Sequence, residues 1–363
     1  MTSPQLIPHN RSAPAELISL AESDIAHIAA FIAAQSGQSK AAVEAHLRWF
    51  LLENPARQSE QPLGFGLRSS GELVGCILCS PQAFQCQGEN ILLMGSSSFY
   101  VDQRFRGQGG RIFLQLSRLA SRWPLFGTSA NPHAAALWKA AGAKPIPHSD
   151  GELLGILNWP PIAEEFAHRR TSSRFLSRLA GTSSSRVATL LHPLKLDPHA
   201  NDALQAITSA GQASELIASN RSEQMSALRN QSYIHWRYFS ARDSSVAAFA
   251  FRSEASSRNI LVTVNQRTRG YRSQIKALHV LDVYPEASAV EWLRIVGVLL
   301  SLYSRDVDAL VLRNQDQEKR KVFCEKGFLW RAFDAPSSWV LDKTKRLSSS
   351  DWYVVPADGD SLI

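Results

Sequence analysis

FYVDQRFRGQGGRIFLQLSRLA, residues 99–120, joins an apolar, strand-like run to a run with helical spacing. Between the two runs stand Gly107, Gly109 and Gly110, and each glycine would cost a regular helix or strand roughly 0.5–1 kcal/mol. Glycines between a strand and a helix let backbone N–H groups point into one small concavity, and the helix N-terminus adds the positive end of its dipole. The stretch therefore favours a phosphate or pyrophosphate ligand.

The glycine turn differs from two common phosphate motifs. A P-loop needs Gly-x-x-x-x-Gly-Lys-Ser/Thr, and no Lys-Ser or Lys-Thr follows here. A dinucleotide fingerprint needs Gly-x-Gly-x-x-Gly early in a βαβ unit, whereas these glycines follow several strands of antiparallel type. The turn instead has the spacing Arg104-x-x-Gly107-x-Gly109-Gly110. Arg106 and Arg111 add positive charge at the same place.

This spacing resembles the acyl-CoA signature Gln/Arg-x-x-Gly-x-Gly/Ala of the GCN5-related N-acetyltransferase superfamily. A second element, GTSANPHAAALWKAAGAKPI at residues 127–146, is similar to the strand, Asn, helix and Gly that follow in the family. Asn131, Leu137 and Gly142 stand at the positions that the family pattern leads us to expect. Asn131 follows Arg104 by 27 residues. The resemblance covers residues 15–160.

The resemblance implies an α/β (α+β) fold, in which a mixed, mostly antiparallel sheet is flanked by helices and splayed open at LMGSSSFYV, residues 93–101. Pantetheine would lie in that gap as a surrogate strand, and pyrophosphate would lie on the N–H groups of residues 105–110. A backbone N–H near Tyr100 or Val101 would polarise the thioester carbonyl. The residues expected to bind acyl-CoA are Val101, Arg104, Phe105, Arg106, Gly107, Gln108, Gly109, Gly110, Arg111 and Asn131.

The implied reaction is direct attack by a primary amine on the thioester, which needs a base or a water chain to deprotonate the amine. Many family members carry a Tyr acid in the helix after the second element, but Trp138 stands there, and an indole N–H is no acid. Ser98 and Tyr100 are the expected catalytic groups, with Ser96 and Ser97 beside them. Each of the four fits a lining role as well as a catalytic one.

The second half repeats the order strand, helix, strand, helix, strand, which predicts a tandem of two such units. We expect an acyl-CoA-binding domain at residues 1–160, an Arg- and Ser-rich connector at 161–200 and a degenerate second unit at 201–363. In place of the glycine turn, DVYPEASAV at 282–290 has Asp282 and Glu286, which would repel pyrophosphate. The second unit is therefore expected to bind no CoA.

Two segments of the second half are candidates for binding the acceptor, SYIHWRYF at 232–239 and WYVVPADGDSLI at 352–363. The functional interpretation is a cleft between the halves in which Trp236, Tyr238, Asp358 and Asp360 hold a cationic or sugar-like acceptor. The alternative is a hydrophobic helix-to-strand corner and a final strand with a solvated acidic tail. The segments resemble bacterial acetyltransferase-like proteins linked to polysaccharide production, which implies an amino sugar or polysaccharide precursor.

Local patterns also predict the first elements of the fold. AELISLAESDIAHIAAFIAAQSG at residues 15–37 has helical spacing throughout and predicts one helix that ends at Gly37. SKAAVEAHLRWFLLEN at 39–54 predicts a second helix, with Ser39 as its N-cap and Pro55 just beyond its end. Strands follow in GFGLRSS, GELVGCILCSP and NILLMGSSSFYV.

Composition narrows the class of protein. With 44% apolar and 20% charged residues, the chain is an ordinary globular one. No apolar run reaches the roughly 18 residues of a membrane span, and no secretory signal is seen. Four unpatterned cysteines suit a reducing, cytoplasmic compartment, and CILC at 76–79 is interpreted as a buried strand with no metal. The net charge of +7 favours anionic ligands, but no motif for binding nucleic acid accompanies it.

The sequence thus predicts an enzyme that moves an acyl group, most simply acetyl from acetyl-CoA, to a primary amine of a small molecule. The alternative is a catalytically silent acyl-CoA-binding protein with a regulatory or structural role. Absence of the Tyr acid and of a strand carboxylate favours that alternative. Release of free thiol in the presence of amines distinguishes the two, and the oligomeric state stays open.

Overall fold

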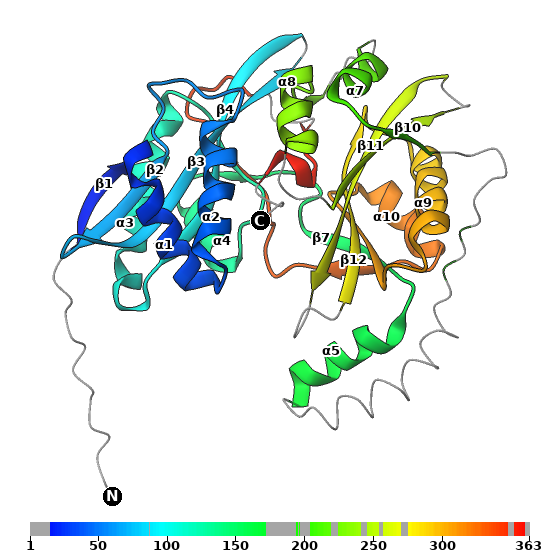
Figure 1. Ribbon diagram of the computed structural model, residues 1–363, viewed down its shortest axis with the longest axis horizontal. Coiled ribbons are helices and arrows are strands. Elements are labelled where there is room, and N and C mark those ends of the chain that lie inside the picture. The colour runs from blue at the N-terminus through cyan, green and yellow to red at the C-terminus, as the bar shows by residue number, and fades with distance from the viewer. Residues whose placement is uncertain are drawn as a thin grey trace, which may run out of the picture.

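The structure, a computed structural model, describes residues 15–86, 88–171, 194, 196, 204–218, 224–240, 245–253, 257–269, 275–347 and 352–359. Two twisted sheets lie next to each other in it, and each has helices packed against it (Figure 1). Their strand orders are β1-β2-β3-β4-β5-β15-β6 and β14-β7-β13-β12-β11-β10-β8. Both sheets are mixed and mostly antiparallel, which confirms the expected fold class.

The first sheet contains one parallel pair on its main path, β4 with β5. Its strands are β1 (Glu16–Leu20), β2 (Gly64–Ser69), β3 (Glu72–Cys86), β4 (Glu89–Val101), β5 (Leu125–Gly127), β15 (Trp339–Leu341) and β6 (Lys144–Pro145), with β9 (Met225–Ala227) beside β3 and β16 (Trp352–Tyr353) beside β9. Its helices are α1 (Ile25–Ser36), α2 (Lys40–Leu47), α3 (Gly109–Arg118) and α4 (Pro132–Ala140).

The second sheet also contains one parallel pair, β12 with β13. Its strands are β14 (Leu329–Ala332), β7 (Gly151–Ile156), β13 (Ala309–Arg313), β12 (Ile275–Tyr284), β11 (Asn259–Arg269), β10 (Val246–Arg252) and β8 (Leu204–Ile207). The helices of this half are α5 (Trp159–Thr171), α7 (Ala210–Ile217), α8 (Gln231–Ile234), α9 (Ala289–Tyr303) and α10 (Gln317–Glu325).

The predicted helix at residues 15–37 is wrong in its first part. Residues 16–20 form β1, which pairs antiparallel with β2, and α1 begins only at Ile25. The apolar residues of this segment fit both the spacing of a helix and the alternation of a strand. Pairing with β2 selects the strand. The end at Gly37 is confirmed, with φ of 72°, and so is the cap of α2, where Ser39 Oγ accepts a hydrogen bond of 3.2 Å from the N–H of Ala42.

Each sheet contains strands from the other half of the chain. β7, from the first half of the chain, lies in the second sheet between β13 and β14, where Leu154 is opposite Val311. β15, from the end of the second half, lies in the first sheet between β5 and β6, where Val340 is opposite Phe126. The predicted domain boundaries at residues 160 and 200 stay a prediction. The two sheets do not separate at these residues, because each sheet contains strands from both halves of the chain.

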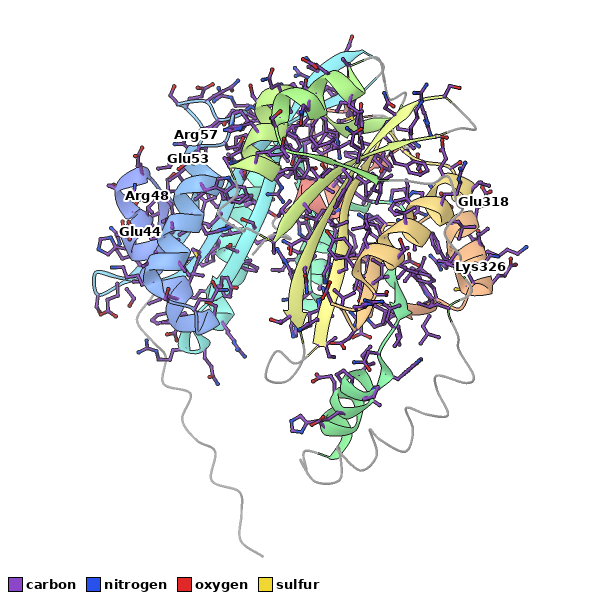
Figure 2. All side chains as sticks on the ribbon, turned by 45° about the vertical axis from the view of Figure 1, so that its right-hand side comes forward. Glu44, Arg48, Glu53, Arg57, Glu318 and Lys326 are labelled. Carbon is purple, nitrogen blue, oxygen red and sulfur yellow. The ribbon has the colours of Figure 1, made fainter. Side chains whose placement is uncertain are left out.

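Helices cover their sheets with apolar faces and expose charged ones. The labelled residues in Figure 2 show such exposed faces on two sides of the molecule, with Arg48 3.0 Å from Glu44 one turn earlier. Under α9 and α10 the second core packs Trp292 against Phe323 at 6.5 Å between ring centroids. No helix in the described ranges is both long enough and apolar enough to span a membrane.

Candidate active site

A notch opens in the first sheet where β4 and β5 separate. Their parallel pairing has two positions, Met94 opposite Leu125 and Gly95 opposite Phe126. β4 continues to Val101 paired with β3 on its other edge, while β5 ends at Gly127. No described strand pairs with residues 96–101 along this edge, so the sheet leaves room there for an extended ligand. The splay that the resemblance implied at residues 93–101 is present.

A β-bulge shapes the wall of this notch. Leu78 is opposite Ser97 but Cys76 is opposite Tyr100, so β4 carries one extra residue there. Ser98 lies in the left-handed region with φ of 50°, and Cys76 Sγ donates to its carbonyl oxygen over 3.6 Å. Burial raises the pKa of the Cys76 thiol to about 12, so Cys76 supports the bulge and is no nucleophile.

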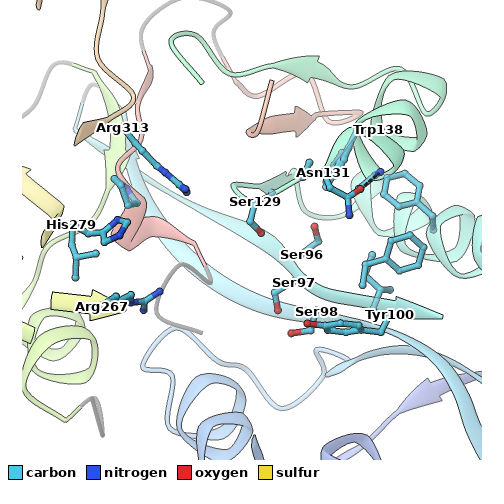
Figure 3. Close-up of a pocket in the computed structure, with 18 of the residues that line it drawn as sticks. Ser96, Ser97, Ser98, Tyr100, Ser129, Asn131, Trp138, Arg267, His279 and Arg313 are labelled. Atoms are coloured by element: carbon cyan, nitrogen blue, oxygen red, sulfur yellow. Dashed lines mark hydrogen bonds between the residues drawn. The ribbon is translucent and has the colours of Figure 1, made fainter. Parts of the chain in front are cut away.

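A cavity of about 420 Å³ begins in this notch and extends to the second sheet. Tyr100 and Asn131 lie at one end of it, and Arg267, His279 and Arg313 at the other (Figure 3). The full lining is Ile77, Ser96, Ser97, Ser98, Phe99, Tyr100, Phe113, Gly127, Ser129, Ala130, Asn131, Ala134, Trp138, Arg267, Arg269, His279, Leu281, Arg313 and Pro356. The predicted catalytic residues Ser98 and Tyr100 are thus brought together with Asn131.

The glycine turn lies just beyond the open end of β4. A Cβ added to Gly107 or Gly110 would meet nothing within 4 Å, and neither residue needs a positive φ. The protein itself therefore does not require glycine at these two positions, whereas a ligand that approaches the backbone does. No side chain caps the first turn of α3, whose N-cap is Gln108. Gly110, in the first turn of α3, is exposed.

The turn differs from prediction in its backbone hydrogen bonds. Residues 103–108 form 3-10 turns, in which the N–H of Phe105 donates to the Asp102 carbonyl at 2.8 Å and that of Gly109 to Arg106. The amides of Phe105 and Gly109, both expected to hold pyrophosphate, are therefore occupied in this structure, and the 3-10 run between them uses further amides of the turn. Arg104 also pairs with Asp102, at 3.0 Å, and the hydrogen bonds from Arg104 lower the pKa of the Asp102 carboxyl.

Two other predicted CoA residues connect α3 to the start of β1. Arg111 Nη1 donates to Gln108 Oε1 at 2.6 Å and to the carbonyl oxygen of Ala15 at 3.0 Å. Gln108 Oε1 also accepts from the Ala15 N–H at 3.3 Å. In this arrangement Gln108 and Arg111 hold the helix in place, while the exposed Arg106 stays at the mouth of the turn.

Asn131 and Trp138 lie on α4, across the notch from β4. Asn131 Oδ1 caps the helix by accepting from the Ala134 N–H at 2.9 Å, which leaves its Nδ2 toward the cavity (Figure 3). Trp138 is buried edge-on against Phe113, with centroids 5.2 Å apart. A Cβ on Gly127 would come within 3.0 Å of the Trp138 ring, so this glycine is needed for packing.

The far wall of the cavity comes from one face of the second sheet. Arg267 and Arg269 alternate on β11, and Arg267 is opposite Ala277, two residues before His279 on β12. His279 is opposite Val311, two residues before Arg313 on β13. Since opposite residues and those two apart share a face, these four side chains point the same way. Sequence reasoning missed them, although Arg-x-Arg in a predicted strand was the available signal.

A single buried carboxylate, Glu152 on β7, stands beside this wall. Glu152 is 0% exposed and lies 2.9 Å from Arg313 Nε, 3.6 Å from Arg269 Nη1 and in contact with Arg331 on β14. Burial and then repulsion from Arg313, Arg331 and Arg267 lower the pKa of Arg269 to about 10. Positive charge is therefore crowded here beyond what Glu152 offsets.

His279 is a neutral imidazole within this positive wall. Burial, and then the arginines 269, 313, 267 and 331, hold the pKa of His279 well below its ordinary value. Its Nε2 is buried and has no hydrogen-bond partner among the residues that the structure describes, and the side chain lines the cavity. A buried polar atom without a partner costs free energy unless a ligand or water satisfies it. His279 is thus a candidate to contact substrate.

The corresponding notch of the second unit is filled by the chain itself. β12 and β13 pair only from Ala277 to His279, and residues 352–359 lie beyond that point. Asn314 Nδ2 donates to the Val354 carbonyl at 2.7 Å, and Tyr353 Oη donates to the Val283 carbonyl. A space of about 10 Å³ is left. A surrogate strand of CoA would find this place occupied.

The predicted reason for a silent second unit therefore needs correction. Asp282 does not face a ligand site, because it is buried and paired with Arg229 at 2.9 Å. Glu286 pairs with Lys319 at 2.6 Å. Residues 352–359, rather than exposed acidic charge, occupy the place that a second nucleotide would need.

The residues predicted to hold the acceptor are not part of the large cavity. Trp236 is 6% exposed, and Tyr238 Oη donates to Asp282 Oδ2 at 2.6 Å. Asp358 pairs with the buried Arg229 at 3.1 Å, and Asp360 lies outside the described residues. A cationic acceptor would have to break this network, so the structure does not bring these groups together as a site.

Among the described residues, no group of three His, Cys, Asp or Glu side chains could hold a metal ion. CILC lies within β3, and Cys76 and Cys79 are buried and unbridged, which confirms the interpretation of this motif as a strand. Burial raises the pKa of the Cys79 thiol to about 12 as well.

No protein-family model and no curated protein sequence matches the chain. Solved structures do match. An N-myristoyltransferase of Saccharomyces cerevisiae with bound myristoyl-CoA matches at a TM-score of 0.57 and 10% identity, over 93% of this chain and 84% of that one. A GCN5-related N-acetyltransferase from Anabaena variabilis gives a TM-score of 0.55 and 10% identity, over 90% and 72%. A probable N-acyltransferase from Enterococcus faecalis gives the same values.

At this identity, likeness of structure establishes the fold. The neighbours include both acetyl- and myristoyltransferases, and their common feature with this chain is the mixed sheet arranged as two units. The chain has the fold of the GCN5-related N-acetyltransferases, as the resemblance at Arg104–Gly109 and Asn131 predicted.

Proposed function

We propose that this protein transfers an acyl group from acyl-CoA to the primary amine of a small molecule. The observation that carries the proposal is the open edge of β4 after Gly95, which leads directly to a turn where Gly107 and Gly110 face open space. An extended chain that ends in a pyrophosphate fits this combination, because the edge offers hydrogen bonds and the turn offers a helix N-terminus. The fold, shared with N-acyltransferases, adds support.

In the proposed complex, pantetheine lies along β4 and its pyrophosphate lies against the backbone of Gly107 and Gly110. Asn131 Nδ2 donates to the pantetheine arm from the opposite wall. The thioester then lies near Ser96, Ser97 and Ser98, between the two ends of the cavity (Figure 3). The polar and charged lining beyond this point suits acetyl better than a long apolar chain, so acetyl-CoA is the proposed donor.

The reaction begins with an ammonium group that gives its proton to a base. The amine nitrogen attacks the thioester carbonyl carbon, the carbonyl oxygen takes up negative charge, and the C–S bond then breaks. The amide and the CoA thiolate are formed, and the thiolate takes up a proton. Ser98 and Tyr100 stay predicted catalytic residues, and we add His279 as a proposed proton acceptor because its imidazole lines the cavity and its buried Nε2 has no partner among the described residues.

Acetyl-CoA binding and thiol release test the proposal. Calorimetry with the full chain is expected to show one bound acetyl-CoA, and amine mixtures are expected to release free CoA thiol. The second candidate function, a silent acyl-CoA-binding protein, is favoured by Trp138 in the place of the family's Tyr acid. Binding without thiol release for any amine would support that candidate, whereas absence of binding would reject both. Cytoplasmic location and the lack of a nucleic-acid partner stay predictions.

A further inference from the structure

We propose that the acyl acceptor is an amine that also carries an anionic group, a carboxylate or a phosphate, and that Arg267, Arg269 and Arg313 bind this group. The inference rests on the proposed function, since it assigns the acceptor end of the same cavity. It replaces the cationic or sugar-like acceptor that the sequence suggested at Trp236 and Tyr238.

The first observation is the position of the arginines. Figure 3 shows Arg267 and Arg313 at the end of the cavity away from Tyr100 and Asn131. Since CoA enters past Tyr100, its phosphates lie at the mouth of the notch and do not reach this wall. The group that these arginines bind therefore arrives with the second substrate, beyond the sulfur of CoA.

The second observation is the balance of charge. Glu152 faces three guanidinium groups, those of Arg269, Arg313 and Arg331. Among the described residues that line the cavity, none is Asp or Glu. Holding several like charges together under partial burial costs free energy, and a bound anion offsets that cost.

The third observation is a pair of buried polar atoms in the cavity wall. His279 Nε2 and Ser97 Oγ are both buried and have no hydrogen-bond partner within the described chain. Both residues line the cavity, His279 among the arginines and Ser97 between the arginines and the CoA end. They offer hydrogen bonds to the substrate between its anionic group and the thioester. A planar guanidinium pairs with a carboxylate and with a phosphate alike. The arginines therefore specify an anionic group without distinguishing between these two.

Anion binding to the CoA-saturated full chain tests this assignment, because CoA then blocks the phosphate turn. Inorganic phosphate and glutarate serve as probes in separate calorimetric titrations. We expect at least one to bind, and Arg267→Gln and Arg269→Gln each to weaken it tenfold or more. Arg305→Gln, an exposed arginine after α9, is the matched control and is expected to bind as the wild type does.

Turnover separates the two anion types. Thiol release from acetyl-CoA is compared for β-alanine against β-alaninamide and for O-phosphoethanolamine against ethanolamine. We expect the charged member of one pair to be preferred at least tenfold in kcat/KM, and Arg269→Gln to remove the preference. A preference for the neutral amine of each pair would overturn the inference. If none of the four amines is acetylated, the binding titration decides.

The titration rejects the inference if neither probe binds the wild type, or if both glutamine variants bind the probes as the wild type does. The proposed function fails by a different result, absence of acetyl-CoA binding to the wild type. Circular dichroism and CoA affinity of each variant confirm that the fold and the donor site are intact.

Discussion

Trp49 and Trp236 donate their indole N–H groups to each other's backbone carbonyl oxygens, both at 3.0 Å. Their rings stack with centroids 5.3 Å apart. Each is the second residue of a π-helical turn, Arg48–Leu52 in the first half and His235–Phe239 in the second. The pair therefore links equivalent places in the two halves of the chain, and it explains the aromatic cluster at residues 232–239 by packing.

Trp236→Ala is expected to destabilise the protein by about 3–5 kcal/mol, because it removes a buried ring and leaves the Trp49 carbonyl oxygen without its indole donor. Chemical denaturation measures this loss. Phe249, on β10 and partly exposed, is a suitable aromatic control whose truncation should cost less. A stable Trp236→Ala enzyme with a raised KM for the amine would instead restore the predicted acceptor role.

Gly107→Glu is expected to weaken acetyl-CoA binding at least a hundredfold, since the added carboxylate meets the pyrophosphate. Gly107→Ala is the matched comparison and should weaken binding far less, because it adds a Cβ but no negative charge. Both variants should melt within a few degrees of the wild type. Normal CoA affinity in Gly107→Glu would show that the nucleotide lies elsewhere.

One CoA is expected to bind per chain, because Asn314 and Tyr353 hold residues 352–359 in the second notch. Glu286→Ala should leave this number at one, since removing an acidic side chain does not empty the notch. Calorimetry with a known active fraction provides the count. A stoichiometry of two would contradict the proposed exclusion.

His279 should make the protein less stable in mild acid. Because its folded pKa is depressed, the unfolded chain takes up a proton that the folded chain refuses as the pH falls below about 6.5. The loss attributable to His279 is absent well above pH 6.5 and grows as the pH falls below it. Urea denaturation of wild type and His279→Gln at pH 7.5 and 5.0 should therefore give a smaller pH effect in the variant. Equal effects would show that His279 protonates freely in the folded protein.

Local sequence was enough to predict the glycine turn, the N-cap Ser39 and the splay after Gly95 that the resemblance implied. Such features depend on neighbours along the chain: a capping side chain bonds to an amide three residues on, and a glycine turn needs only the strand before it and the helix after it. The prediction from sequence was wrong where apolar residues fit both helical spacing and strand alternation, as in β1 at residues 16–20.

The sequence by itself thus determined the fold class and the donor end of the cavity, because both are encoded in short contiguous runs. Only the tertiary structure decided the exchange of β7 and β15 and the assembly of Arg267, His279 and Arg313 on one wall. The physical reason is that strand pairing is non-local: a short apolar strand fits either sheet by its own pattern, and packing alone selects its neighbours.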